Sequence, residues 1–416
     1  MKKTQKALAC LLFSFPFLFS GLSAQVTWKF NSALQSGYEH NPFRNPAFSD
    51  SNSGNSDEEN DEEGEDEADG EAGEFEEGEE NEGRNTTPSA PFTQLTSAFQ
   101  LKQKTKRQEL RWDTDVRGTA YFGLPEANQF QGSTQLQYGL NLSQNTQWLS
   151  RGSLTILRGA NAADRVNVFR FNFSYVQADA ATGLKFRLPN KHTLRVLATY
   201  RFKNYETAGD WLFRYQAFGL EGRALLMLDP DRAFRKRLLL ILSATDRFYN
   251  GAVTGLPEEG ELGIADSSDA PARNWLYTRA RAEYQMDIAK RLRIAPFVAW
   301  TGRHDLSGTG FGFAEGKVGL KAALTTESFR AQAQTSVAYR HYPNQNAGED
   351  APLQYLLARV SGDVGFALGR GLWLNAGGRL IARHSNNAST TVLSRRSYMN
   401  YQVWAGISFD IKGKRK

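Results

Sequence analysis

Long stretches of strict two-residue alternation constrain this chain more than any other feature. Residues 110–122, 276–288 and 329–341 place apolar side chains at every second position and mostly charged or amide side chains between them. A period of two is that of a β-strand, whose successive side chains point to opposite faces. Such stretches run for 12 to 14 residues, whereas strands of soluble proteins mostly have about 5 or 6.

Length and polarity together select one all-β architecture. A strand that crosses a bilayer at a tilt needs about 9–11 residues in the hydrocarbon, with lipid on one face and water on the other. Closure into a barrel pairs every backbone N–H and C=O between strands, as lipid demands. The sequence therefore predicts one transmembrane antiparallel up-and-down β-barrel over residues 25–411. No run reaches the roughly 18 apolar residues of a membrane helix, so a helical membrane protein is excluded.

Connection lengths are predicted to alternate between short turns and long polar loops, which is typical of outer-membrane barrels with periplasmic turns and external loops. Sixteen strands are predicted, with fourteen and eighteen left open. Their starts lie near residues 26, 92, 109, 133, 147, 166, 192, 211, 237, 275, 292, 316, 329, 353, 372 and 395. The stretch 166–188 changes phase; we interpret it as one strand with a bulge near Ala178–Thr182, because splitting it would give seventeen.

Residues 1–24 are typical of a secretory signal peptide. Three lysines precede the apolar segment Ala7–Phe19, and Leu22-Ser23-Ala24 is an acceptable cleavage site. The only cysteine is Cys10, so the mature chain is expected to have neither disulfide nor thiolate chemistry. The expected location is the outer membrane, with residues 412–416 as a basic C-terminal tail.

The formal charge of +5 combines two unlike parts. Residues 57–82 hold 17 Asp and Glu in 26 positions, whereas the rest of the mature chain has 47 basic and 28 acidic residues, or +19. Such an acidic tract cannot bury apolar surface, so residues 45–91 are expected to form a disordered external loop. Three roles stay open: a solvated repulsive loop, weak and diffuse divalent-cation binding, and a plug tethered above a basic lumen.

Alternation along the predicted strands places many arginines on the inward face. The lumen-lining candidates are Arg111, Arg117, Arg170, Arg195, Arg201, Arg279, Arg281, Arg293, Arg303, Arg330, Arg340, Arg379 and Arg383. Inward acids are fewer, and Arg111/Asp113 and Arg281/Glu283 are candidate ion pairs. The sequence leaves two interpretations open: a lumen that favours anions, since rings of charge set pore selectivity, and a lumen of mutually compensated pairs.

Signals for catalysis are weak. The five histidines show no metal-ligand spacing, and neither a nucleophile elbow nor a phosphate loop occurs. His304, His341 and His384 each follow an inward arginine and are expected at the outer edge, where they pack at the interface or contact lipopolysaccharide phosphate. Arg383-His384-Ser385-Asn386 is similar to the His-x-Ser-Asn element of outer-membrane lipid hydrolases, but adjacent strand residues point to opposite faces. We expect no enzymatic activity, no cofactor and no metal site.

The two ends of the predicted barrel carry a resemblance to a known class. Residues 37–44 read Gly-Tyr-Glu-His-Asn-Pro-Phe-Arg, which resembles the Gly-Tyr-x-x-Asn-x-Phe-Arg opening strand of porin-like Gram-negative outer-membrane β-barrel proteins. Some of these are associated with surface polysaccharide systems. The final strand, with Trp404, Gly406 and Phe409, also resembles theirs, but Ile411 stands where those barrels usually have an aromatic residue.

These features predict a channel that passes small solutes, with anions favoured by an arginine-rich lumen. The first alternative is an assembly or export partner for surface polysaccharide or lipoprotein, and the second is an outer-membrane lipid hydrolase. The expected partners are outer-membrane lipid, lipopolysaccharide and the barrel assembly machinery. A basic body in a secreted barrel does not indicate nucleic acid.

The plug hypothesis for the acidic tract makes a direct prediction. Deleting residues 57–82 should raise the conductance of the purified protein in planar bilayers, because a chain segment of charge −17 no longer competes for the basic lumen. A conductance identical to that of the full chain would contradict a plug.

Overall fold

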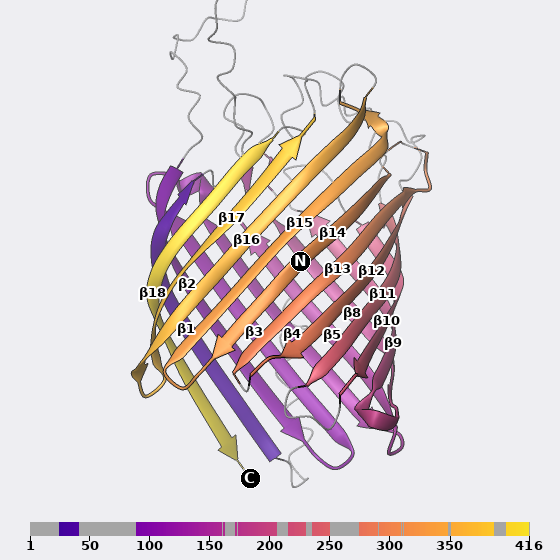
Figure 1. Ribbon diagram of the computed structural model, residues 1–416, viewed down its shortest axis with the longest axis vertical. Coiled ribbons are helices and arrows are strands. Elements are labelled where there is room, and N and C mark those ends of the chain that lie inside the picture. Colours follow the sequence, from indigo (N-terminus) through magenta and orange to yellow (C-terminus); the bar gives the residue numbers. More distant parts are fainter. Residues whose placement is uncertain are drawn as a thin grey trace, which may run out of the picture.

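A computed structural model describes residues 25–40, 89–159, 161–162, 171–172, 174–205, 215–229, 235–249, 274–289, 291–308, 310, 312–347, 351–386 and 397–415. Sixteen strands of this part of the chain form one closed antiparallel barrel (Figure 1). They are β1 (Gln25–His40), β2 (Ser89–Lys104), β3 (Gln108–Tyr121), β4 (Gln129–Asn141), β5 (Thr146–Arg158), β8 (Tyr175–Arg187), β9 (Thr193–Tyr205), β10 (Tyr215–Met227), β11 (Lys236–Tyr249), β12 (Asn274–Asp287), β13 (Leu292–Asp305), β14 (Phe313–Thr325), β15 (Phe329–Asn346), β16 (Pro352–Gly369), β17 (Leu372–Ser385) and β18 (Tyr398–Arg415).

Each barrel strand pairs with the strands before and after it in the chain, and β1 pairs with β18 to close the ring. The remaining regular elements of the described residues are small. Strands β6 (Asn161–Ala162) and β7 (Phe171–Asn172) pair with each other outside the barrel sheet, and two 3-10 turns cover Pro125–Ala127 and Pro189–Lys191. In the part of the chain that is described, no helix is long and apolar enough to cross a membrane.

The predicted barrel and its strand number are confirmed, with two differences in boundaries. The doubtful strand begins at Tyr175 rather than near residue 166, and its pairing with β5 and β9 is continuous, without the predicted bulge. Phe171 belongs instead to the short β6–β7 pair. Strand β18 continues through the basic tail to Arg415, because its backbone pairs with the first residues of β1, Val26 opposite Arg415.

The barrel has two unlike ends. Short connections join the strands at one end, for example residues 105–107 between β2 and β3 and residues 326–328 between β14 and β15. We call this the turn end; it lies at the bottom of Figure 1. The opposite, loop end carries the longer connections, including residues 41–88 between β1 and β2. The predicted signal peptide, the acidic tract and Arg170 lie outside the described residues.

Alternation divides the wall into an apolar outer face and a polar inner face. Large apolar side chains such as Leu95, Leu220, Leu242, Val298 and Val318 are between 54% and 62% exposed, and all of them point outward. A cluster of Leu149, Ala181 and Leu197 is buried on the inner face toward the turn end, and two further buried apolar clusters lie at the loop end. One contains Phe92, Tyr121 and Leu124, and another contains Tyr342, Leu353 and Tyr355.

Closure brings backbones together tightly at Gly37 on β1. A Cβ atom there would lie 2.0 Å from the carbonyl oxygen of Val403 on β18 and 3.0 Å from the Phe92 ring. Only a hydrogen atom fits in this space, so a side chain would push β1 away from the strand that closes the ring. Gly118 on β3, in contrast, has no atom within 4 Å of such a Cβ.

We predict that Gly37→Val destabilises the barrel, whereas the matched variant Gly118→Val does not. Crowding of this kind costs about 1–3 kcal/mol, and valine at the open position suits a strand. The measurement is the urea midpoint of unfolding in detergent micelles, followed by tryptophan fluorescence. Equal midpoints for the two variants would show that the seam tolerates a side chain at position 37.

Candidate functional site

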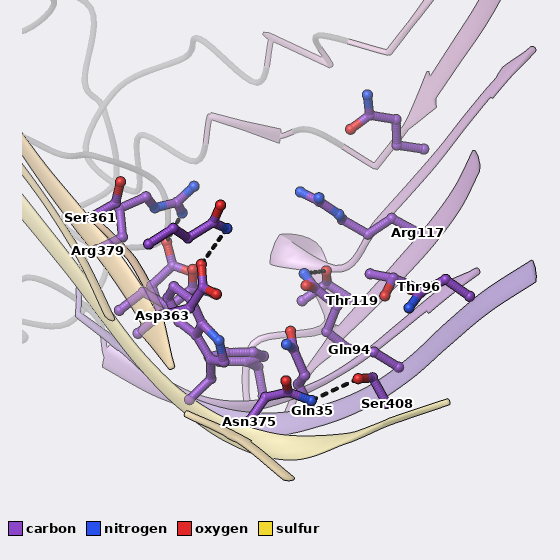
Figure 2. A pocket seen from close by; sticks show the side chains of 18 of the residues that line it. Gln35, Gln94, Thr96, Arg117, Thr119, Ser361, Asp363, Asn375, Arg379 and Ser408 are labelled. Atoms are coloured by element: carbon purple, nitrogen blue, oxygen red, sulfur yellow. Dashed lines mark hydrogen bonds and ion pairs between the residues drawn. The ribbon is translucent and has the colours of Figure 1, made fainter. Parts of the chain in front are cut away.

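A cavity of about 790 Å³ runs along the inner wall of the barrel. It extends from loop-end residues such as Tyr121 and Gln129 to turn-end residues such as Thr325 and Ser408. Figure 2 shows Arg117 and Thr119 on one side of this space and Arg379, Ser361 and Asp363 on the other. A second cavity of about 370 Å³ lies beside it, lined by β12 to β16. The cavity lining is largely polar, as expected for a wall that faces water.

The loop end of the closure seam is organised around one buried carboxylate. Glu39 is 3% exposed and accepts hydrogen bonds from Tyr121 Oη at 2.6 Å, Asn400 Nδ2 at 2.9 Å and Gln402 Nε2 at 3.0 Å. Arg379 Nη2 lies 3.5 Å from Oε1, the oxygen that also accepts from Asn400. Burying a carboxylate is costly without such donors, and here they come from β3, β17 and β18. This network joins strands from both ends of the chain.

A second network holds the turn end of the same seam. Arg330 on β15 donates to Asn375 Oδ1 at 2.8 Å and to Ser408 Oγ at 2.9 Å. It also pairs with Asp410 at 3.3 Å and lies over the Trp373 ring, with Cζ 4.5 Å from the ring centre. One guanidinium on β15 therefore reaches past β16 to connect with β17 and β18, a use for which its planar fork of donors is suited.

Two carboxylates anchor the wall between β11 and β14. Glu283, 5% exposed, accepts from Lys321 Nζ at 2.9 Å and Gln285 Nε2 at 2.8 Å, and it also pairs with Arg281. Asp287 pairs with Arg293 at 2.8 Å and with Arg237 at 3.3 Å. Each carboxylate thus has two basic partners, and the inner surface here keeps a positive balance.

Cations and aromatic rings alternate around the loop end of the lumen. Lys203 lies over Tyr175, and Arg247 lies between Tyr215 and Tyr277, 4.3 Å and 4.2 Å from their ring centres. The series continues with Arg303 over Trp275 and Phe313, Arg340 over Phe313, and Arg383 over Tyr355 and Tyr398. Stacking of this kind orients each cation without neutralising its charge. We call this series the aromatic–cation ring.

The predicted lumen arginines fall into three groups. Ion pairs hold Arg111, Arg195, Arg201, Arg281, Arg293, Arg330, Arg340 and Arg379. Arg303 and Arg383 belong to the aromatic–cation ring, while Arg117 lines the larger cavity and Arg279 lies at an inward position of β12. Both ion pairs named from the sequence, Arg111/Asp113 and Arg281/Glu283, are present.

Other inward cations were not singled out from the sequence. They are Arg151, Lys185, Lys203, Arg223, Arg237, Arg247, Lys317, Lys321 and Arg359. Extending the same alternation through β5, β8, β9, β10, β11, β14 and β16 identifies them. The role of Glu39 had no local signal, because its donors Asn400 and Gln402 lie at the far end of the chain.

The candidate lipid-hydrolase element does not assemble. His384 stands opposite outward Leu356, whereas Ser385 stands opposite inward Tyr355 and is 8% exposed. The two side chains therefore leave the strand on opposite faces. His304 and His384 are exposed on the outer face, where His304 Nε2 lies 3.4 Å from Thr278 Oγ1. Among the described residues, no group of three or more His, Cys, Asp or Glu could hold a metal ion.

Comparison with known proteins returned solved structures only; no family model and no curated protein matches this chain. OccAB3 of Acinetobacter baumannii is 9% identical, with a TM-score of 0.42 over 94% of this chain and 100% of that chain. A loop L8 deletion mutant of OmpT, an outer membrane protein of Vibrio cholerae, is 7% identical, with a TM-score of 0.41 over 94% of this chain and 100% of that chain. A FadL homologue of Pseudomonas aeruginosa is 11% identical, with a TM-score of 0.34 over 94% and 90%.

We predict that Glu39→Ala strongly destabilises the barrel, because it leaves buried donors of β3 and β18 without an acceptor. Breaking a buried charged network costs about 3–5 kcal/mol. The matched control is Glu109→Ala, which removes an exposed ion pair with Lys102 worth about 0–1 kcal/mol. Urea unfolding in micelles compares the two variants. Equal loss of stability would mean that the seam does not depend on Glu39.

Proposed function

We propose that this chain is a channel of the outer membrane that passes small solutes and favours anions. The outward apolar face supports membrane insertion, since a lipid-facing band alternating with a polar interior is typical of transmembrane barrels. In this proposal the turn end faces the periplasm and the loop end faces the exterior. The polar cavity, which reaches from the loop end to the turn end, is the route for solutes.

One observation carries the preference for anions: cations outnumber acids on the inner face of the described wall. Asp113, Asp179, Glu221, Glu315 and Asp410 each pair with an arginine. Asp115 and Asp363 accept hydrogen bonds from Ser133 and Gln332 rather than from a cation. In the described part of the wall, several inward cations make no ion pair and have no carboxylate partner. Among them are Arg117, Arg151, Lys185, Arg223, Arg279, Lys317 and Arg359. Unneutralised charge in a narrow aqueous passage raises the local concentration of counter-ions.

The paired arginines serve a different purpose in this proposal. Ion pairs facing water contribute little to stability, but they fix long side chains against the wall and keep them out of the passage. The compensated pairs and the anion preference are therefore compatible. The pairs shape the lumen, and the unpaired cations set its potential.

We further propose that the protein is not an enzyme and acts without a cofactor. The separation of His384 and Ser385 onto opposite faces supports this. Outer-membrane lipid and lipopolysaccharide would surround the apolar face, and the barrel assembly machinery would insert the secreted chain.

Planar-bilayer recording tests the channel directly. Purified protein should produce discrete conductance steps in potassium chloride, and a salt gradient should give a reversal potential of the sign set by chloride permeation. No conductance from folded protein would overturn the channel, and cation preference would overturn the role of the unpaired arginines.

Charge reversal should shift this selectivity. We predict that Arg117→Glu combined with Arg359→Glu lowers the chloride-to-potassium permeability ratio by about twofold or more, because two unpaired cations in the wall become anions. Arg107→Glu, in the exposed turn between β2 and β3, serves as the control for a charge change outside the wall. A ratio unaffected by the double reversal would contradict the proposal.

A further inference from the structure

At several positions of this wall, opposite charges face each other across neighbouring strands. Asp179 stands opposite Arg201, Asp287 opposite Arg293 and Glu315 opposite Arg340. Each of these pairs forms an ion pair. Directly opposed residues have Cβ atoms about 4.5–5.5 Å apart, so complementary charge at such positions neutralises the wall locally.

Three neighbouring strands break this pattern at one level. Lys185 on β8 stands directly opposite Arg195 on β9, which stands directly opposite Arg223 on β10. We call these three residues the cation row. They lie in the turn-end half of the barrel, on three strands that are adjacent in the sheet (Figure 1). Like charges directly opposite each other destabilise a sheet, so the arrangement costs folding free energy.

Little in the surrounding wall offsets this charge. Arg195 pairs with Glu221 on β10, but in the described structure neither Lys185 nor Arg223 makes an ion pair or a hydrogen bond. The row is flanked by Gln147 on β5, opposite Lys185, and by Ile241 on β11, opposite Arg223. With Glu221 included, the group keeps a net charge of +2.

Two other opposed cation pairs differ from the row. Lys29 and Lys412 stand opposite each other and make no ion pair in the described structure, but they place only two cations on two strands. Lys102 stands opposite Arg111, but Lys102 pairs with Glu109 at 2.9 Å and Arg111 pairs with Asp113 at 2.7 Å. Each cation there has its own carboxylate. In the cation row, two of the three cations have none.

We infer that the cation row is a binding site for a compact doubly charged oxyanion, such as a phosphate group, within the lumen. Two guanidinium groups and one ammonium on adjacent strands can converge on one tetrahedral anion, which accepts charge-assisted hydrogen bonds from each. A dianion matches the net charge of +2, whereas chloride or a monocarboxylate leaves half of it unneutralised. The side chain of Arg223 is exposed to the lumen, so a passing solute can reach it. The site deepens the proposed function by naming a class of solute.

Inorganic phosphate is the probe, and the readout is its block of chloride current through wild-type channels. The test variant is Lys185→Gln with Arg223→Gln, which removes both cations that lack a carboxylate. The control is Arg279→Gln with Arg359→Gln, which makes the same change in net charge. The control cations stand alone, between Ser243 and Thr301 and between Ser336 and Ile381.

The site predicts that phosphate blocks the wild-type current and that acetate at the same concentration does so much less. In the row variant the half-blocking phosphate concentration should rise about tenfold or more, equivalent to about 1.4 kcal/mol of binding. In the control variant it should change far less. Absence of block in the wild type, or an equal shift in the two variants, would overturn the inference.

Equilibrium dialysis of detergent-solubilised protein against radiolabelled phosphate separates this inference from the channel itself. Binding that is lost in the row variant and kept in the control supports the site even if no conductance is found, which would overturn only the channel. Conductance without phosphate binding would keep the channel and overturn the site. A sugar phosphate as competitor tells whether the site accepts a phosphate monoester as well as the free ion.

Discussion

Closure of the hydrogen-bond ladder is the constraint on which this structure depends. A sheet with open edges leaves a row of unpaired N–H and C=O groups on each side, which lipid cannot satisfy. Here the first barrel strand pairs with the last over nearly its whole length, from Val26 opposite Arg415 to His40 opposite Tyr401. The extension of β18 into the basic tail follows from the same requirement, because the first residues of β1 need partners.

Closure also determines the chemistry of the interior. Once the ring is formed, each alternating strand sends its polar residues to a common aqueous space, and register decides which of them meet. Glu39 shows the consequence, because its donors Asn400 and Gln402 on β18 are brought to it only by closure, whereas Tyr121 reaches it from β3. The register of strand pairing around the barrel therefore determines which long side chains of the inner wall meet.

Much of the architecture could be predicted from the sequence, because alternation is a local property that is visible within a single strand. The strand number, the inward arginines and the pair Arg281/Glu283 all follow from it. The start of β8 was placed too early because Phe169, Phe171 and Phe173 also alternate, and a periodicity cannot say which strand a segment pairs with. The cation row does not follow from alternation for a related reason: Lys185, Arg195 and Arg223 become neighbours only through the registers of consecutive strands, and a periodicity does not give a register.

The distribution of charge separates cations that have a carboxylate partner from cations that have none in this wall. A cation whose carboxylate stands across or along the strand, as in Arg201 with Asp179, is accounted for by the stability and shape of the lumen. Such pairs create little net field beyond their immediate surroundings, because the two charges nearly cancel and water screens the remainder. A cation without a carboxylate partner repels neighbouring cations without a compensating attraction, and its electric field extends into the lumen. The cation row places three directly opposed cations on three adjacent strands with one carboxylate among them, so the stability of the fold does not explain it.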